Sequence, residues 1–159
     1  MNAKLDQIDL SILNDLQGSG RITNVELAKR AGISAPPCLR RVNALENEGI
    51  IASYHAHLNP QALGFTVTIF AEVALTSKND VDLRSFEEKI QEWPLVRECY
   101  MVTGGADFLL KIIAQDFDAY QTFLSTQLAT FPLVSQTKTC MVVRTSKSKP
   151  GVPLELINL

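Results

Sequence analysis

The chain has 159 residues, of which 46% are hydrophobic and 20% are charged, and its formal net charge is −2. This composition is that of an ordinary globular protein, and the length suits one or two small domains. No apolar run approaches the ~20 residues that a membrane-crossing helix needs, and the first residues lack the pattern of a signal peptide, so we expect a cytoplasmic protein with no membrane partner.

Three cysteines, Cys38, Cys99 and Cys140, lie far apart in the chain, and none belongs to a Cys-x-x-Cys pair. This spacing suggests neither a disulfide framework nor a thiolate zinc site. We expect reduced and mostly buried thiols.

Three short helices are predicted in the first 50 residues. Apolar residues recur at helical spacing from Leu5 to Leu16, and the glycines that follow end the first helix. Thr23 and Glu26 have the spacing of a capping box and begin a second helix, which Gly32 ends. The core shared by the three helices is expected to contain Ile12, Leu16, Leu27, Leu39, Val42 and Leu45.

The third helix follows the second after a tight turn, which is the geometry of a helix-turn-helix. Ser34 is the expected N-cap, because its hydroxyl can accept a hydrogen bond from a free N–H of the first turn. Pro36 and Pro37 fall at the second and third helical positions, where no N–H partner is lost. Opposite its apolar side the helix presents a short, positively charged face that includes Arg40, with Arg41 on its flank.

From the pattern alone, this third helix suits contact with another protein or contact with DNA. In the DNA interpretation its N-terminal end enters the major groove, where Arg40 reaches a guanine edge or a phosphate and Ser34 with the helix N-terminus meets a phosphate. Residues 1–57 carry as many acidic as basic side chains, and the net charge argues mildly against nucleic-acid binding. DNA binding therefore requires that the basic side chains gather on one face of this domain and the acidic side chains on another.

Residues 50–58 are expected to form an extended segment that links two domains and ends at Asn59 and Pro60. His55 and His57 share one face of this segment, but no third ligand is nearby in the sequence. We therefore favour a solvent-facing or interface strand over a metal site.

From residue 66 onward the order of elements is β, α, β, β, α, β. Strands are predicted at 66–75, 96–103, 108–114 and 135–144, with amphipathic helices at 80–93 and 117–131. This order is that of a ferredoxin-like fold with a four-stranded antiparallel sheet. The tail beyond Lys147 is expected to be extended or loosely docked.

Both faces of that sheet are apolar in the sequence pattern, whereas helices cover only one of them. A second copy of the chain packed sheet to sheet is the economical explanation, so we predict at least a homodimer. The alternative is that the N-terminal domain of the same chain covers this face.

The turn Gly104-Gly105-Ala106-Asp107 joins the second and third strands. A tight β-hairpin explains these residues without any ligand. Alternatively, the glycine N–H groups cradle a carboxylate and Asp107 offers a partner for an ammonium group, and these match the two charged ends of an amino acid.

The chain carries several short motifs in a fixed order: Leu5-Asp6 with Ile8-Asp9, Gly20-Arg21, Ser34 with Pro37–Arg41, Leu45-Glu46, Gly49-Ile50, and Gly104 with Asp107–Leu110. Over nearly its whole length this combination resembles the Lrp/AsnC family of bacterial and archaeal transcription regulators. Many relatives carry an acidic or bulky residue where Gly105 and Ala106 stand, so leucine should not be assumed as the ligand.

The resemblance implies an α+β fold: an N-terminal winged-type helix-turn-helix domain followed by a ferredoxin-like βαββαβ effector and oligomerisation domain. The expected boundaries are 1–50 for the first domain, 51–65 for a linking strand and turn, 66–145 for the second domain and 146–159 for a tail. The implied partners are double-stranded DNA, an amino acid bound between neighbouring dimers, and further copies of the chain, with dimers assembling into octamers or open rings.

We accordingly predict a sequence-specific DNA-binding transcription regulator modulated by an amino acid or related small molecule, with no cofactor. The alternative is a ligand-sensing oligomeric module without direct DNA binding. An enzyme is not expected, because no nucleophile, base and orienting group converge in the sequence. DNA contact is assigned to Arg21, Ser34, Ala35, Pro36, Pro37, Arg40, Arg41 and Ala44, and effector contact to Thr103, Gly104, Gly105, Ala106 and Asp107.

Overall fold

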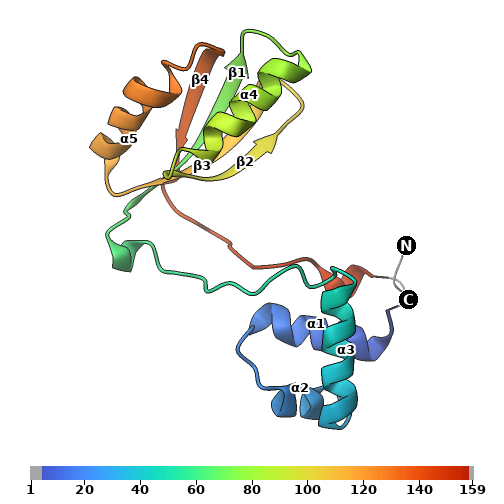
Figure 1. Cartoon of the computed structure of the whole chain (residues 1–159). Coiled ribbons are helices and arrows are strands. Elements are labelled where there is room, and N and C mark those ends of the chain that lie inside the picture. Colours follow the sequence, from blue (N-terminus) through green and yellow to red (C-terminus); the bar gives the residue numbers. More distant parts are fainter. Residues whose placement is uncertain (1–4, 158–159) are drawn as a thin grey trace. The chain divides into compact units, whose positions relative to one another are not determined.

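The computed structural model describes residues 5–157, which form two compact units (Figure 1). The first, here the helical unit, consists of the chain up to His57 together with the residues from Lys147 onward. It contains α1 (Gln7–Gly18), α2 (Asn24–Arg30) and α3 (Ala35–Asn47), and a short 3₁₀ turn at Leu154–Leu156. The second, here the sheet unit, spans Leu58–Ser146.

Each helix of the helical unit begins at a polar residue, but the three caps differ. Asp6 caps α1 in a reciprocal capping box with Asp9. Thr23 accepts the Glu26 N–H at the start of α2, whereas the Glu26 carboxylate turns to Arg30, so the expected capping box is only half formed.

Ser34 precedes α3 as predicted, but its hydroxyl makes no capping hydrogen bond. An N-cap side chain accepts from the N–H of the second or third helical residue. Here those residues are Pro36 and Pro37, which have no N–H to donate. The expected cap bond is therefore absent for a covalent reason.

The core of the helical unit is formed by apolar residues of all three helices: Ile12, Leu13, Leu27, Ala28, Cys38 and Leu45. Leu39 was expected in this core and is 50% exposed instead. It follows the buried Cys38 by one residue, a rotation of about 100° that takes its side chain off the core side of α3.

The C-terminal tail is part of the helical unit and is more firmly held than expected. Leu154 is only 8% exposed and packs in the core of the three helices. Gln17 of α1 makes two hydrogen bonds to the main chain of Val152, donating from Nε2 to the carbonyl at 3.0 Å and accepting the N–H at 2.8 Å. The tail therefore closes the helical unit.

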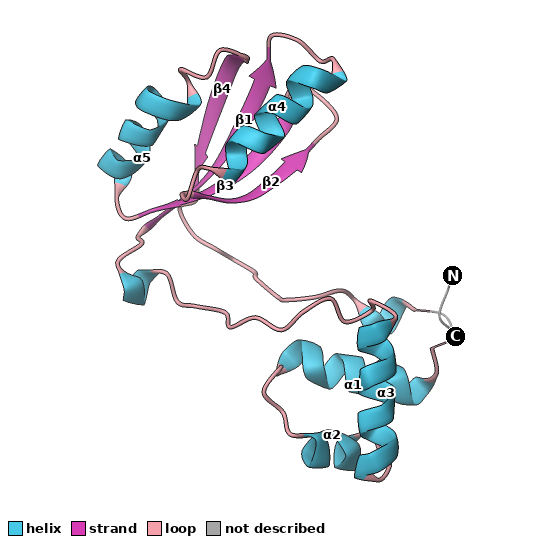
Figure 2. Ribbon diagram, viewed as in Figure 1, coloured by secondary structure: helices cyan, strands magenta, loops and turns pink. Residues whose placement is uncertain are grey.

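Residues 50–58, where a linking strand was expected, are unpaired chain (Figure 2). A strand requires a neighbouring strand that accepts and donates main-chain hydrogen bonds. Among the described residues this segment belongs to no sheet, and the main-chain bonds it makes run from the Ile50 and Ile51 N–H groups to the Leu45 carbonyl of α3. Its β-branched and aromatic residues favour extended backbone but cannot supply that neighbour.

The sheet unit has the predicted βαββαβ order. Its elements are β1 (Val67–Leu75), α4 (Asp80–Gln91), β2 (Val96–Met101), β3 (Phe108–Ala114), α5 (Phe117–Phe123) with a π-helical turn at Leu124–Leu128, and β4 (Val134–Met141). The strands lie in the order β2-β3-β1-β4, all neighbours antiparallel. Both helices lie over one face of the sheet (Figure 1), where Phe86, Tyr120 and Phe123 pack on the buried residues of β1 and β3. The ferredoxin-like prediction is confirmed.

The opposite face of the sheet is mixed rather than uniformly apolar. Phe70 and Leu109 are half-buried there, but ion pairs flank them. Lys111 lies 2.6 Å from Glu98, and Lys138 lies 3.5 Å from Glu72. Among the described residues, no helix is long and apolar enough to cross a membrane.

Candidate nucleic-acid interface and effector turn

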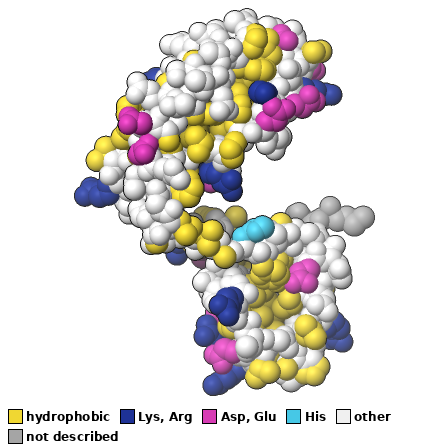
Figure 3. All heavy atoms as spheres, turned by 60° about the vertical axis from the view of Figure 1, so that its left-hand side comes forward, with side chains coloured by type: hydrophobic (Ala, Val, Ile, Leu, Met, Phe, Trp, Pro, Cys, Tyr) yellow, Lys and Arg dark blue, Asp and Glu magenta, His cyan; other side chains and the backbone are white. Residues whose placement is uncertain are grey.

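The side chains assigned to DNA contact do not share one environment. Arg21, Ser34, Pro36, Arg40 and Ala44 are exposed, whereas Ala35, Pro37 and Arg41 are partly buried. Over the face of the helical unit seen in Figure 3, lysine and arginine side chains are interspersed with aspartate and glutamate. The interface must therefore be defined residue by residue, not by a basic patch.

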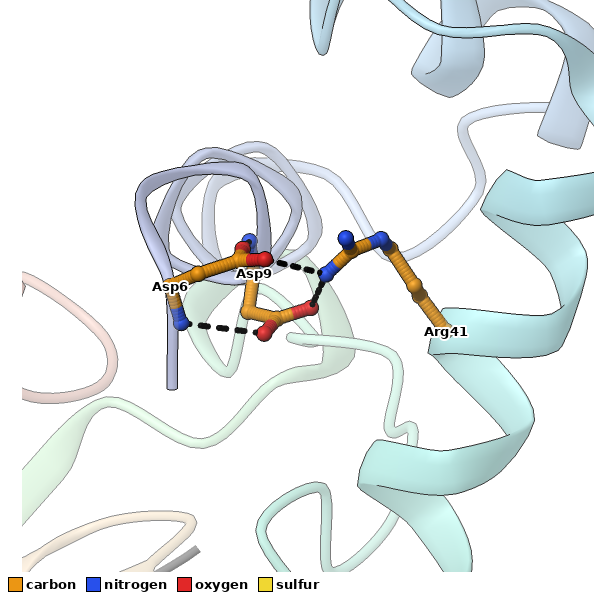
Figure 4. Close-up of polar contacts among 3 residues, drawn as sticks. All are labelled: Asp6, Asp9 and Arg41. Carbon is orange, nitrogen blue, oxygen red and sulfur yellow. Dashed lines mark hydrogen bonds and ion pairs between the residues drawn. The ribbon is translucent and has the colours of Figure 1, made fainter. Parts of the chain in front are cut away.

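Arg41 is bound to α1 within the helical unit (Figure 4). Its Nη1 lies 2.7 Å from Oδ1 of Asp9 and 2.8 Å from Oδ2 of Asp6, the two residues that form the α1 capping box. The Asp9 N–H and then the Arg41 guanidinium lower the pKa of Asp6 below its ordinary value. Arg41 thus joins the start of α1 to the middle of α3.

Arg40, the neighbouring arginine, is exposed and has no ion pair or hydrogen bond among residues 5–157. Its charge is therefore available to a phosphate or a base edge. The sequence alone placed both arginines near the same face of the helix. In the structure they differ, because Arg41 is paired with two aspartates of the helical unit and the Arg40 side chain has no partner among the described residues.

The N-terminus of α3 offers fewer donors than an ordinary helix start. In its first turn only Ala35 has an N–H, because the next two residues are prolines. The Ser34 hydroxyl, unused as a cap, adds one more donor. On the other side, Asn24 of α2 donates from Nδ2 to the Ala35 carbonyl at 2.9 Å, which fixes the two helices of the helix-turn-helix against each other.

Two exposed residues of α3 were missed by the sequence reasoning. Asn43 lies one turn after Arg40 on the same exposed side, and Leu39 is half exposed beside them. An asparagine amide can pair with an adenine edge, and an apolar side chain can contact a thymine methyl. Cys38 is the signal that could have identified these two residues. Because Cys38, and not Leu39, lies on the core side of α3, Leu39 and Asn43 fall on its exposed side.

The turn from Thr103 to Ala106 is a four-residue hairpin loop. It is closed by the Val102 N–H, which donates to the Asp107 carbonyl at 2.9 Å, and Gly104 has a φ of 124°, a conformation that other residues rarely adopt. No residue among 5–157 accepts a hydrogen bond from the N–H groups of 103–106. These main-chain donors are therefore free, and that they cradle a carboxylate stays a prediction.

Asp107 is not a free carboxylate. It is 8% exposed, its Oδ2 accepts the Leu75 N–H at 2.9 Å, and its Oδ1 lies 2.8 Å from the Nζ of Lys78. Lys78 first, and the Leu75 N–H second, lower the pKa of Asp107. Lys78 lies in the loop between β1 and α4, and no local sequence pattern linked it to the turn.

Comparisons with known proteins place both units. A model of the Lrp/AsnC ligand binding domain matches residues 68–152, and a model of winged helix-turn-helix DNA-binding domains matches residues 5–52. The leucine-responsive regulatory protein of Rhizobium meliloti (strain 1021) is 46% identical over 147 residues, which cover 92% of this chain and 94% of that protein. The protein of the same name from Escherichia coli (strain K12) is 41% identical over 143 residues, 90% of this chain and 87% of that one.

Solved structures agree with this match. The transcriptional regulator NMB0573 of Neisseria meningitidis, crystallised as an L-Met complex, superposes with a TM-score of 0.91 at 34% identity, over 95% of this chain and 97% of that chain. E. coli AsnC superposes with a TM-score of 0.86 at 28% identity, over 95% of this chain and 100% of that chain.

Proposed function

The chain belongs to the Lrp/AsnC family of helix-turn-helix transcription regulators, and we propose that α3 contacts DNA through Arg40 while the turn at 103–107 binds an amino acid or a related small molecule. The observation that carries the first part is the exposed, unpaired guanidinium of Arg40 on the outer face of the recognition helix. The second part is supported by the free N–H groups of the turn and by the L-Met complex of the relative NMB0573.

In this proposal the exposed residues of α3 have distinct roles. Arg40 binds a guanine edge or a phosphate, and Asn43 and Leu39 contact neighbouring bases in the major groove. Ser34 and the Ala35 N–H bind one phosphate at the helix start, and Arg21 adds a phosphate contact before α2. Arg41 acts indirectly, because it holds α3 against α1.

A dimer formed through the outer face of the sheet would pair two helix-turn-helix units and so read a pseudo-palindromic site. The half-buried Phe70 and Leu109 on that face support this arrangement, with larger assemblies built from such dimers. A bound amino acid would act by favouring one geometry of the assembly over another, which changes the spacing of the DNA-contacting helices. Contact with chromosomal DNA would place the protein in the cytoplasm.

Selection of bound fragments from a random-sequence duplex library, with and without a mixture of the twenty L-amino acids, tests the proposal. We expect a related set of fragments to be enriched and the amino acids to change the enrichment. Binding that is absent or insensitive to salt would instead favour the ligand-sensing module without DNA contact, since phosphate contacts make DNA affinity strongly salt-dependent.

A further inference from the structure

The Asp107 carboxylate is poorly placed to receive a ligand's ammonium group. Both oxygens are engaged inside the sheet unit, one by the Leu75 N–H and one by Lys78, and the side chain is almost fully buried. Its negative charge is also balanced by the lysine at 2.8 Å. A ligand's ammonium group would therefore have to share this buried carboxylate with Lys78.

The main chain around Lys78 is ordered by its neighbours, whereas its side chain is largely exposed. Its main chain lies between Ser77 and Asn79, and Asn79 both caps α4 and donates to the Ser77 hydroxyl at 2.9 Å, so the loop is fixed. The Lys78 side chain is nevertheless 68% exposed. An ammonium group has three N–H donors. With one directed to Asp107, the others have no partner among residues 5–157 and can bind a ligand.

The turn and the lysine together form a site of donors. The free N–H groups of 103–106 carry partial positive charge, and Lys78 adds a full charge at the residue that closes the loop. The Asp107 carboxylate, which follows the turn, is already paired with Lys78. A carboxylate complements such a site, whereas a second ammonium group does not.

Building on the effector site proposed above, we propose that Lys78 binds the ligand's carboxylate and that Asp107 is a positioning residue for Lys78 instead of a partner for the ligand's ammonium group. The ligand class is thus set by its carboxylate: the 2-oxo acid that corresponds to a bound amino acid binds as well, and the corresponding carboxamide does not.

Calorimetric titration of the full chain tests this assignment. Each of the twenty L-amino acids is titrated first, and the tightest is then compared with its 2-oxo acid and its carboxamide. For the wild type we expect the 2-oxo acid to bind within about threefold of the amino acid and the carboxamide to bind at least tenfold more weakly. If no amino acid binds, the effector function proposed above fails and this inference fails with it.

The variant Lys78→Met distinguishes two roles of the lysine. Ligand affinity should fall if Lys78 binds the ligand's carboxylate, and it should rise if Lys78 competes with the ligand's ammonium group for Asp107. We expect it to weaken both acids about tenfold, with Lys78→Arg restoring most of the affinity. Tighter binding of the amino acid to Lys78→Met would show that Lys78 competes with the ligand's ammonium group, and it would overturn the proposal, as would unchanged affinity. Lys89→Met removes an ion-paired lysine from the far end of α4 and serves as the matched control.

Asp107→Asn tests the positioning role. The amide can still accept the Leu75 N–H but no longer attracts Lys78, so we expect a loss of affinity in the wild type that disappears in the Lys78→Met background. Selective loss of the amino acid with retention of its 2-oxo acid would assign Asp107 to the ammonium group and contradict the proposal. Thermal unfolding of each variant confirms that it is folded.

Discussion

Replacing the adjacent arginines of α3 one at a time should separate DNA contact from stability. Arg40 has no partner among the described residues, so Arg40→Ala should change the free energy of unfolding by less than about 0.5 kcal/mol. Its contact with DNA should be lost, which for a base contact costs about 1–3 kcal/mol, or roughly 5- to 150-fold in affinity. The slope of log affinity against log salt should also fall by about one for a phosphate contact.

Arg41→Ala should show the reverse. It leaves Asp9, whose side chain is 13% exposed, beside Asp6 with no cation between them. The loss of the Arg41–Asp9 pair should destabilise the helical unit by about 1 kcal/mol. DNA affinity measured well below the unfolding temperature should change little, because the guanidinium is bound to Asp6 and Asp9.

Thermal unfolding and fluorescence anisotropy with a selected duplex measure both quantities on the same samples. Unchanged DNA affinity of Arg40→Ala at moderate salt would remove Arg40 from the interface. A variant Arg41→Ala that unfolds like the wild type but loses DNA affinity would refute the structural role of its ion pairs and make Arg41 a DNA contact.

The remaining predictions concern the caps, the tail and pH. Ser34→Ala should leave the unfolding free energy unchanged, whereas Thr23→Ala, which removes a formed cap bond, should cost about 1 kcal/mol in urea unfolding. Leu154→Ala should destabilise the helical unit by about 2–4 kcal/mol, which a tail that docks loosely would not do. The pKa of Asp107 is lowered in the folded chain, so its ionised carboxylate stabilises the fold. This stabilisation is complete above the ordinary pKa of 3.8 and is lost as pH falls through the lower folded pKa. Asp107→Asn should therefore lose less stability than the wild type between about pH 5 and pH 2, as followed by acid unfolding.

The elements of both units could be predicted because their determinants are local. Apolar spacing gave the helices, and alternation with Gly and Pro gave the strands and the turn at Gly104. The order of these elements was sufficient for the ferredoxin-like fold, since few topologies fit it.

Two of the differences, the docked tail and the missing strand, have causes that no local pattern contains, whereas the exposure of Leu39 follows from its position on the helix. Leu39 follows the helical period only approximately, and its neighbour Cys38 takes the core position. The tail is held by Gln17 and by the core of the three helices, which are far away in the sequence. The expected strand at 50–58 has suitable residues but lacks a partner.

In the candidate sites, the types of residue were foreseen but their pairings were not. Arg41 and Asp107 were both expected to face ligands, and each carries an ion pair formed with a residue 29 or more positions away. Such pairs depend on how the elements pack, so the sequence alone could not distinguish a free charge from a neutralised one.

The most direct test of the account is the affinity of the wild-type protein for a selected duplex and for a scrambled duplex of the same length, measured across a range of salt concentrations. We predict that the selected duplex binds at least about 10³-fold more tightly than the scrambled one, and that both affinities fall steeply as salt increases. Equal affinity for the two duplexes, or affinity that does not change with salt, would contradict a sequence-specific regulator that reads DNA through α3.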